Sequence, residues 1–182
     1  MKILLWILAA IAVVVITLLI TAIFIKKDYT VKRDIIINAP KHIVFDYIRF
    51  LKNQDYYNKW VMTDPNMKKS FTGTDGTVGF VYGWNGNKEA GEGELILMGI
   101  TEGERVDQEI RFVRPMEAIA QANLVTTSIG ENQTKVEWLM SSEMKYPFNA
   151  ALLVMDMDKI LGKDLQISLG YLKDILENKA NL

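Results

Sequence analysis

Two glutamates are the residues of this sequence that best suit acid–base chemistry. Glu92 and Glu94 lie two positions apart in a stretch that alternates like a β-strand, so their side chains share one face. Inside a cavity, burial would raise the pKa of such a carboxyl group and fit Glu94 to act as a general base. On the outer face of a sheet the same pair is only solvated, and this second interpretation is the favoured one.

Other catalytic groups are scarce. The chain contains no cysteine and a single histidine, His42. This composition excludes disulfides and cysteine nucleophiles, and within one chain it excludes a histidine-based triad or a multi-histidine metal centre. No motif has catalytic spacing. We therefore predict no catalytic residue, no metal site and no cofactor, and the sequence favours a binding protein over an enzyme.

Aromatic and methionine side chains form a more suggestive group. Ligand pockets are mostly apolar with a few placed polar groups, and methionine adapts to irregular guests. The alternative for each of these residues is that it only fills the core, and for Trp84 a loop tip or cavity mouth is a further alternative. The candidate ligand-binding residues are Trp60, Tyr82, Trp84, Met98, Phe112, Trp138 and Met140.

The elements that must position these residues are mainly strands. Apolar and polar residues alternate with a period of two, and short turn sequences rich in glycine, asparagine or proline separate the runs. The connections are too short for crossover helices, so we expect an antiparallel meander. The predicted strands are Tyr29–Asn38, Lys68–Thr72, Val78–Tyr82, Glu89–Ile100, Glu104–Val113, Ala118–Ser128 and Thr134–Met144.

Three helical segments complete the predicted order β-α-α-β6-α. A short helix begins near Pro40, a second runs over 51–60, and a long one covers 150–176. The long helix has one apolar stripe over roughly 40 Å, which a curved sheet would bury. A helix lying on a membrane or pairing with itself is the alternative. Gly162 and Gly170 interrupt the apolar and polar pattern of this helix, and they would either leave room for a cavity or allow close contact with the sheet.

The first part of the chain is a long apolar segment. The run from Ile3 to Ile25 has no charged residue and is flanked by Lys2 and Lys26-Lys27. As a helix it is roughly 35 Å long, enough to cross a hydrocarbon core of about 30 Å. A cleaved signal peptide is the alternative, but the run exceeds an h-region and lacks a convincing cleavage site. We predict a single-pass anchor over 1–27 and one domain over 28–182.

The charges after the apolar run bear on the orientation of the anchor. Lys26, Lys27, Lys32 and Arg33 outnumber Lys2 on the other side. The positive-inside bias therefore favours a cytoplasmic domain, and an extracytoplasmic one stays open.

The joints between the predicted elements resemble a known superfamily. The segment Ile35–Ile48 reads IIINAPKHIVFDYI, and it resembles the opening of START-like, helix-grip (SRPBCC) proteins, a superfamily that includes polyketide cyclases/dehydratases, pollen allergens and lipid-transfer domains. Trp60 and three later stretches are also similar to this family: Gly79–Gly86 (GFVYGWNG), Gly91–Gly93 (GEG) and Thr134–Trp138 (TKVEW). The resemblance covers about residues 29–178. It implies an α+β helix-grip fold, in which a seven-stranded antiparallel sheet wraps around the C-terminal helix with a cavity between them. The N-terminal anchor is a departure from many members.

Three functions are compatible with these observations. The leading hypothesis, which the resemblance implies, is a membrane-tethered domain that binds a hydrophobic or amphipathic, lipid-like small molecule in the cavity. The second is a cyclase/dehydratase-like enzyme with a cavity carboxylate, and the third is a non-catalytic protein-interaction module with a filled interior. With 21 basic and 22 acidic residues and no basic patch, nucleic acid is not an expected partner. The sequence indicates no particular protein partner.

Overall fold

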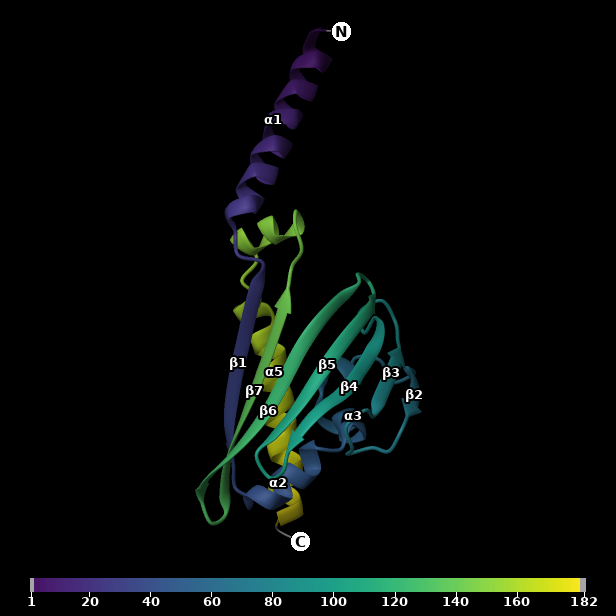
Figure 1. Cartoon of the computed structure of the whole chain (residues 1–182), viewed down its shortest axis with the longest axis vertical. Helices are drawn as coiled ribbons and strands as arrows, with labels where there is room; N and C mark the ends of the chain where they lie inside the picture. Colours follow the sequence, from purple (N-terminus) through teal and green to yellow (C-terminus); the bar gives the residue numbers. More distant parts are fainter. Residues whose placement is uncertain (1, 181–182) are drawn as a thin grey trace.

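A single apolar helix stands away from the rest of the chain. The computed structural model describes residues 2–180, with side chains described through residue 178. Helix α1 (Lys2–Phe24) extends from one end of the folded part (Figure 1), and only Ala22, in its last turn, is buried. The helix is long and apolar enough to cross a membrane.

The folded part is built on one antiparallel sheet of seven strands. The order across the sheet is β1-β7-β6-β5-β4-β3-β2, so consecutive strands from β2 to β7 are neighbours and β1 closes the β7 edge. This confirms the predicted meander. The strands are β1 (Asp28–Ile37), β2 (Lys68–Thr72), β3 (Val81–Asn85), β4 (Glu92–Thr101), β5 (Arg105–Arg114), β6 (Ala118–Gly130) and β7 (Gln133–Glu143).

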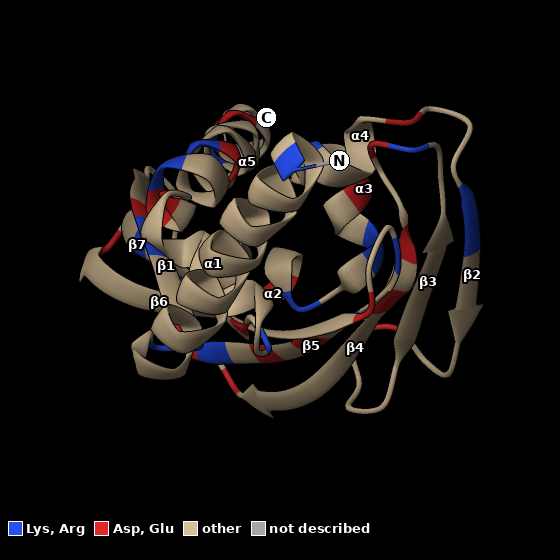
Figure 2. Ribbon diagram, turned by 90° about the horizontal axis from the view of Figure 1, so that it is seen from above, with Lys and Arg blue, Asp and Glu red and all other residues tan. Residues whose placement is uncertain are grey.

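The long C-terminal helix lies on the concave side of the sheet, as predicted, and short helices lie beside it. Seen from the α1 end, the strands curve around the side occupied by α5, α3 and α4 (Figure 2). The predicted second helix is divided into three short pieces. The helical elements after α1 are α2 (Lys41–Ile48), η1 (Leu51–Asn53), α3 (Gln54–Tyr57), α4 (Lys59–Met62), η2 (Phe148–Leu153) and α5 (Met157–Ala180).

The long C-terminal helix begins later than its apolar periodicity predicts. The predicted start near residue 150 falls in the separate 3₁₀ helix η2, and α5 begins at Met157. Asp156 causes this break, because its carboxylate accepts a hydrogen bond from the Lys159 amide at 3.0 Å and caps the first turn of α5. The apolar stripe of α5 then packs into the sheet, and Leu165, Leu169 and Leu172 are fully buried.

Strand β3 is displaced by three residues from its predicted position. The prediction of a strand over 78–82 and a turn from Trp84 to Asn87 was wrong. Gly79 adopts a φ of +91° in the preceding loop, and pairing with β4 continues through Trp84 opposite Gly93 to Asn85 opposite Glu92. Cross-strand pairing therefore overrides the turn preference of the Asn85-Gly86 sequence.

The predicted inner faces of the later strands are confirmed. Val136, Trp138 and Met140 of β7 are buried, as are Val106 and Gln108 of β5. Their neighbours along each strand point to the outer face.

One glycine of α5 has a clear structural role. A Cβ at Gly162 would collide with the guanidinium of Arg33, which donates to the Asp158 carboxylate at 2.8 and 2.9 Å and to the Asp158 carbonyl at 2.8 Å. Gly162 therefore allows close contact between α5 and β1. A Cβ at Gly170 would meet no atom within 4 Å, so close packing does not explain that glycine.

Two interior tyrosines should respond in opposite ways to loss of their hydroxyl groups. Within residues 2–180 the Tyr57 hydroxyl has no hydrogen-bond partner, whereas the Tyr82 hydroxyl donates to Asp55 at 2.6 Å. We expect Tyr57→Phe to raise the free energy of unfolding by about 1 kcal/mol and Tyr82→Phe to lower it by about 1.5 kcal/mol. Urea unfolding of the full chain in detergent at pH 8 measures both, and equal effects would contradict the assignment.

Burial also makes these tyrosines sensitive to alkaline pH. It raises the pKa of both phenols well above the ordinary value, and for Tyr82 the hydrogen bond to Asp55 adds to the rise. The unfolded chain releases these protons near pH 10 while the folded chain retains them. The contribution of these two neutral phenols to the free energy of unfolding is therefore fully present below about pH 10 and is lost as the pH rises above that value. Tyr57→Phe should reduce that fall, which unfolding measured at pH 8 and about pH 10.5 will reveal.

Candidate functional site

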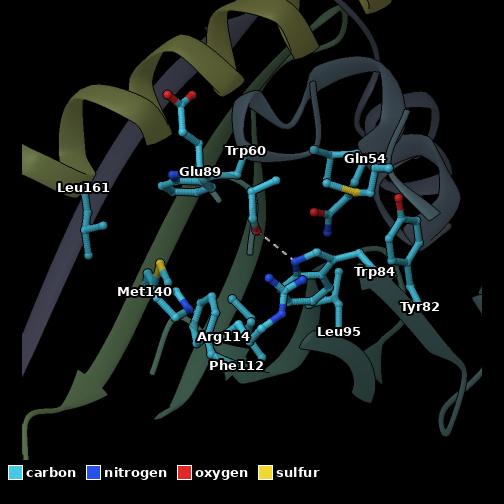
Figure 3. Close-up of a pocket in the computed structure, with 15 residues that line it drawn as sticks. Gln54, Trp60, Tyr82, Trp84, Glu89, Leu95, Phe112, Arg114, Met140 and Leu161 are labelled. Atoms are coloured by element: carbon cyan, nitrogen blue, oxygen red, sulfur yellow. Dashed lines mark hydrogen bonds between the residues drawn. The ribbon is translucent and has the colours of Figure 1, made fainter. Parts of the chain in front are cut away.

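An apolar cavity of about 270 Å³ lies between the concave face of the sheet and the helices. Its walls come from elements far apart in the sequence (Figure 3). The sheet contributes Tyr82, Trp84, Leu95, Ile110, Phe112 and Met140, and the helices contribute Gln54, Trp60, Val61 and Leu161.

The register of the sheet places the cavity walls in two adjacent rows. Tyr82 pairs with Leu95, and Leu95 pairs with Ile110. In the next row, Gly93 pairs with both Trp84 and Phe112. Side chains in register on neighbouring strands share a face. The partners of Leu95 and Gly93 therefore all face the same space; they are Tyr82, Ile110, Trp84 and Phe112.

Trp84 is held in place by three contacts. Its indole lies over Gly93, where an added Cβ would be 2.6 Å from the ring. Its ring centroid is 6.0 Å from that of Phe112 in an edge-to-face arrangement. Its Nε1 donates to the Ala90 carbonyl at 3.1 Å, the dashed line in Figure 3. This residue is thus a fixed, half-buried wall near the cavity mouth rather than the tip of a loop.

Buried amides form the polar part of the cavity surroundings. Gln54, which lines the cavity, accepts from Asn58 Nδ2 at 2.7 Å and donates through its Nε2 to Gln108 Oε1 at 3.2 Å. All three side chains are buried. In the part of the chain that the structure describes, Gln108 Nε2 on β5 and Trp138 Nε1 on β7 have no hydrogen-bond partner. Neither of these two side chains lines the cavity, and Gln54 is the amide of this group that offers a ligand a polar contact.

The cavity opens to solvent beside an ion pair. Glu89, Arg114 and Pro115 line it and are exposed. Arg114 donates through Nε to Glu92 at 2.7 Å and through Nη2 to the Asn85 side chain at 2.7 Å. The mouth therefore carries a guanidinium whose charge is largely balanced by a carboxylate.

Five of the seven predicted ligand-binding residues line this cavity: Trp60, Tyr82, Trp84, Phe112 and Met140. Trp138 is buried but packs edge-on against Tyr57, with centroids 6.0 Å apart, and is not part of the lining. Met98 is 46% exposed and does not line the cavity. Its position was predictable from alternation, because Met98 shares the face of Glu94, four residues earlier.

Several lining residues were missing from the predicted set. Leu95 and Ile110 lie on the inner faces that alternation identifies, and Leu161 belongs to the apolar stripe of the C-terminal helix, so each had a signal. Nothing in the pattern singled out Gln54, which reaches the cavity only through the short helix α3.

Glu94 does not lie in the cavity. It is exposed on the outer face of β4, and Glu92 on the same face pairs with Arg114. The solvated interpretation of this pair, which the sequence favoured, is therefore correct, and the alternative in which Glu94 is a cavity base is wrong. The acidic residue that does line the cavity, Glu89, is exposed.

Solved structures of other proteins share the fold of this chain. No family model matches the sequence, and no curated protein matches it. A protein from Nitrosospira multiformis is 20% identical with a TM-score of 0.59, covering 85% of this chain and 100% of its own. Norcoclaurine synthase from Thalictrum flavum, bound to a transition-state analogue, is 7% identical with a TM-score of 0.65, covering 85% and 98%. The Aha1 dimer from Colwellia psychrerythraea is 16% identical with a TM-score of 0.56, covering 82% and 96%.

These likenesses confirm the fold that the sequence resemblance implied. The chain has the helix-grip fold of the START-like, or SRPBCC, superfamily, preceded by an N-terminal apolar helix. At these identities the likeness establishes the fold alone, since one fold supports many functions.

Proposed function

We propose that this protein binds a hydrophobic or amphipathic small molecule in the cavity while residues 1–27 anchor it in a membrane. Residues 28–182 form the binding domain. The observation that carries the proposal is the cavity of about 270 Å³, walled by aromatic and aliphatic side chains and bordered by a small set of buried amides. An apolar space with a few convergent polar groups is the usual form of a small-molecule site.

The size of the cavity limits the ligand. Ligand pockets are commonly about 300–1,000 Å³, so a cavity of about 270 Å³ suits a compact ring system or part of one hydrocarbon chain. A phospholipid with two acyl chains would not be enclosed. The proposed ligands are therefore fatty acids, isoprenoids and small ring compounds.

The amides near the cavity indicate how the ligand is oriented. Gln108 Nε2 is a buried donor without a partner among the described residues, and its Oε1 is occupied by Gln54. Gln108 itself does not line the cavity, whereas its partner Gln54 does, so a carbonyl, ether or hydroxyl oxygen on the ligand would lie beside the Gln54 end of this amide pair. The proposed ligand carries one such acceptor on an otherwise apolar body.

The two alternative functions have less support. Norcoclaurine synthase is an enzyme with this fold, but the carboxylate considered for catalysis here, Glu94, is on the outer face. An interaction module was expected to have a filled interior, whereas this interior contains a cavity. Binding without chemistry is therefore the function that the geometry supports best. We also propose that the domain lies on the cytoplasmic side of the membrane, because the lysines that follow the apolar run favour that orientation.

Photo-crosslinking tests the proposal. The full chain is reconstituted in phosphatidylcholine vesicles containing diazirine derivatives of hexadecanoic acid, an isoprenoid alcohol or a sterol, and labelled peptides are mapped by mass spectrometry. We expect at least one probe to label β3 and β7 at the lining residues Trp84 and Met140. Saturation by the unmodified compound is the control. Labelling confined to α1 with every probe would mean that the cavity does not take these ligands.

A further inference from the structure

The segment that follows the last strand exposes an unusual number of apolar side chains. Val154 is 87% exposed and Phe148 is 65% exposed, with Leu153 at 61%. Tyr146 and Met155 beside them are also exposed. We call residues 146–155, which contain η2, the η2 segment. A single exposed apolar residue needs no explanation, but a contiguous group of this kind marks an interaction surface.

The η2 segment is fastened to the end of the apolar helix. Buried Asn149 donates through Nδ2 to the carbonyl oxygens of Ala22, at 2.7 Å, and Ile25, at 3.0 Å. These carbonyls lack partners within the helix, so Asn149 caps α1. Ala22 is fully buried by this contact, and η2 lies directly beneath α1 in Figure 1.

This attachment sets the depth of the η2 segment. Ala22 and Ile25 belong to the uncharged run from Ile3 to Ile25. When that run crosses a bilayer, its last residues lie at the boundary between the acyl chains and the headgroups. Side chains that pack against those residues lie at the same boundary. The adjoining Lys26 and Lys27 suit the headgroup layer.

The cavity lies at the same end of the sheet. Tyr29, near the start of β1, is in register with Ser142, which pairs with Ala120. Ala120 pairs with Ile110, whose row continues through two further cavity residues, Leu95 and Tyr82. The exposed lining residues Arg114 and Pro115 lie beyond this row. The cavity mouth and the exit of α1 are therefore at one end of the domain.

We propose that the η2 segment is a second membrane contact, embedded in the interfacial layer of the bilayer beside α1. Together the two contacts hold the cavity mouth toward the lipid surface, and the ligand enters from the membrane rather than from water. Exposed aromatic and aliphatic side chains are the type that binds this layer. Acidic and basic residues are interspersed when the domain is seen from the α1 end (Figure 2), so no large block of one charge opposes close approach. The proposal rests on the proposed function in that α1 crosses the bilayer.

Depth-dependent quenching tests the contact. The chain has no cysteine, so one introduced cysteine carries a nitrobenzoxadiazole label at a single site. Three full-chain variants in phosphatidylcholine vesicles are compared: Val154→Cys in the η2 segment, Ile20→Cys in α1, and Glu131→Cys in the distant β6–β7 turn. We expect doxyl-labelled lipid to quench the Val154 and Ile20 sites several-fold more than iodide does. The Glu131 site should show the reverse.

The other outcomes are decisive as well. If the Val154 site behaves like Glu131 while Ile20 is quenched by lipid, the η2 contact is refuted and the anchor stands. If Ile20 is not quenched by lipid, the membrane span of the proposed function fails, and this inference fails with it. If the Val154 site is shielded from both quenchers, protein covers the η2 segment and the lipid contact is refuted.

A paired charge substitution tests the route of entry. Phe148→Asp/Val154→Asp places two carboxylates in the proposed interface, and Val78→Asp/Ile129→Asp places two at exposed apolar positions away from it. From vesicles containing diazirine hexadecanoic acid, we expect initial cavity labelling to fall about tenfold in the first variant only. Equal labelling in both variants would refute entry from the membrane.

Discussion

Leu161→Trp should weaken ligand binding strongly, with little loss of stability of the fold. Leu161 reaches the cavity from α5 and is only partly buried, so the substitution adds volume to the cavity more than to the close-packed core. An indole there would occupy much of a space of about 270 Å³. We expect photo-labelling of the cavity to fall by at least about tenfold, which corresponds to about 1.4 kcal/mol of binding free energy.

The neighbouring residue provides a matched control. Ile160 is also aliphatic and belongs to the same helical turn, but its side chain is exposed. Ile160→Trp should retain native labelling, and both variants should unfold within a few degrees of the native chain. If the cavity residues are photo-labelled as strongly in Leu161→Trp as in Ile160→Trp, the cavity is not the binding site.

Gly93→Ala should be among the most destabilising single-methyl additions in the sheet. A Cβ at Gly93 would collide with the backbone carbonyl oxygen of Arg111 and lie 2.6 Å from the Trp84 ring. The backbone cannot move away without disturbing the β4–β5 pairing, which is already irregular at Glu92/Gly93. We expect a loss of about 1–3 kcal/mol in the free energy of unfolding, together with weaker ligand labelling because the Trp84 wall shifts.

Gly99→Ala on the same strand distinguishes this effect from a general cost of replacing glycine. The nearest atom to its added Cβ is a carboxylate oxygen of Asp107 at 3.2 Å, a side-chain atom that can move. Alanine also restricts the unfolded chain more than glycine does, a gain of about 0.4–1 kcal/mol. Gly99→Ala should therefore be nearly neutral in urea unfolding. Equal losses at the two positions would show that close packing of Trp84 on Gly93 is not the cause.

Alternation and turn chemistry predicted most of the architecture. In β5 and β7, apolar residues repeat with a period of two, and burial follows that repeat because successive side chains point to opposite faces. The same local rule identifies the inner positions of Leu95 and Ile110. The prediction from turn residues failed at β3, where pairing with β4 extends the strand through Asn85. The turn preference of Asn85-Gly86 is weaker than the several hydrogen bonds of the β3–β4 ladder.

Helix boundaries depended on contacts that periodicity does not contain. The apolar spacing continues from residue 150 into α5, yet the Asp156 cap and the Asn149 contact with α1 divide the segment into two elements. The same division turns part of the predicted stripe outward. Leu153 lies within the helix predicted over 150–176 and follows its apolar periodicity, but it is 61% exposed because it belongs to η2 rather than to α5.

The sequence by itself determined the apolar N-terminal helix, the inward faces of the strands and the order of elements that identifies the helix-grip fold. These features depend on local composition and period, which are properties of neighbouring residues. Only the tertiary structure decided which side chains share the cavity. The Trp84–Gly93–Phe112 row, Gln54 and Leu161 are brought together by strand register and helix packing. A shift of one residue in register would turn a whole strand's side chains to the other face.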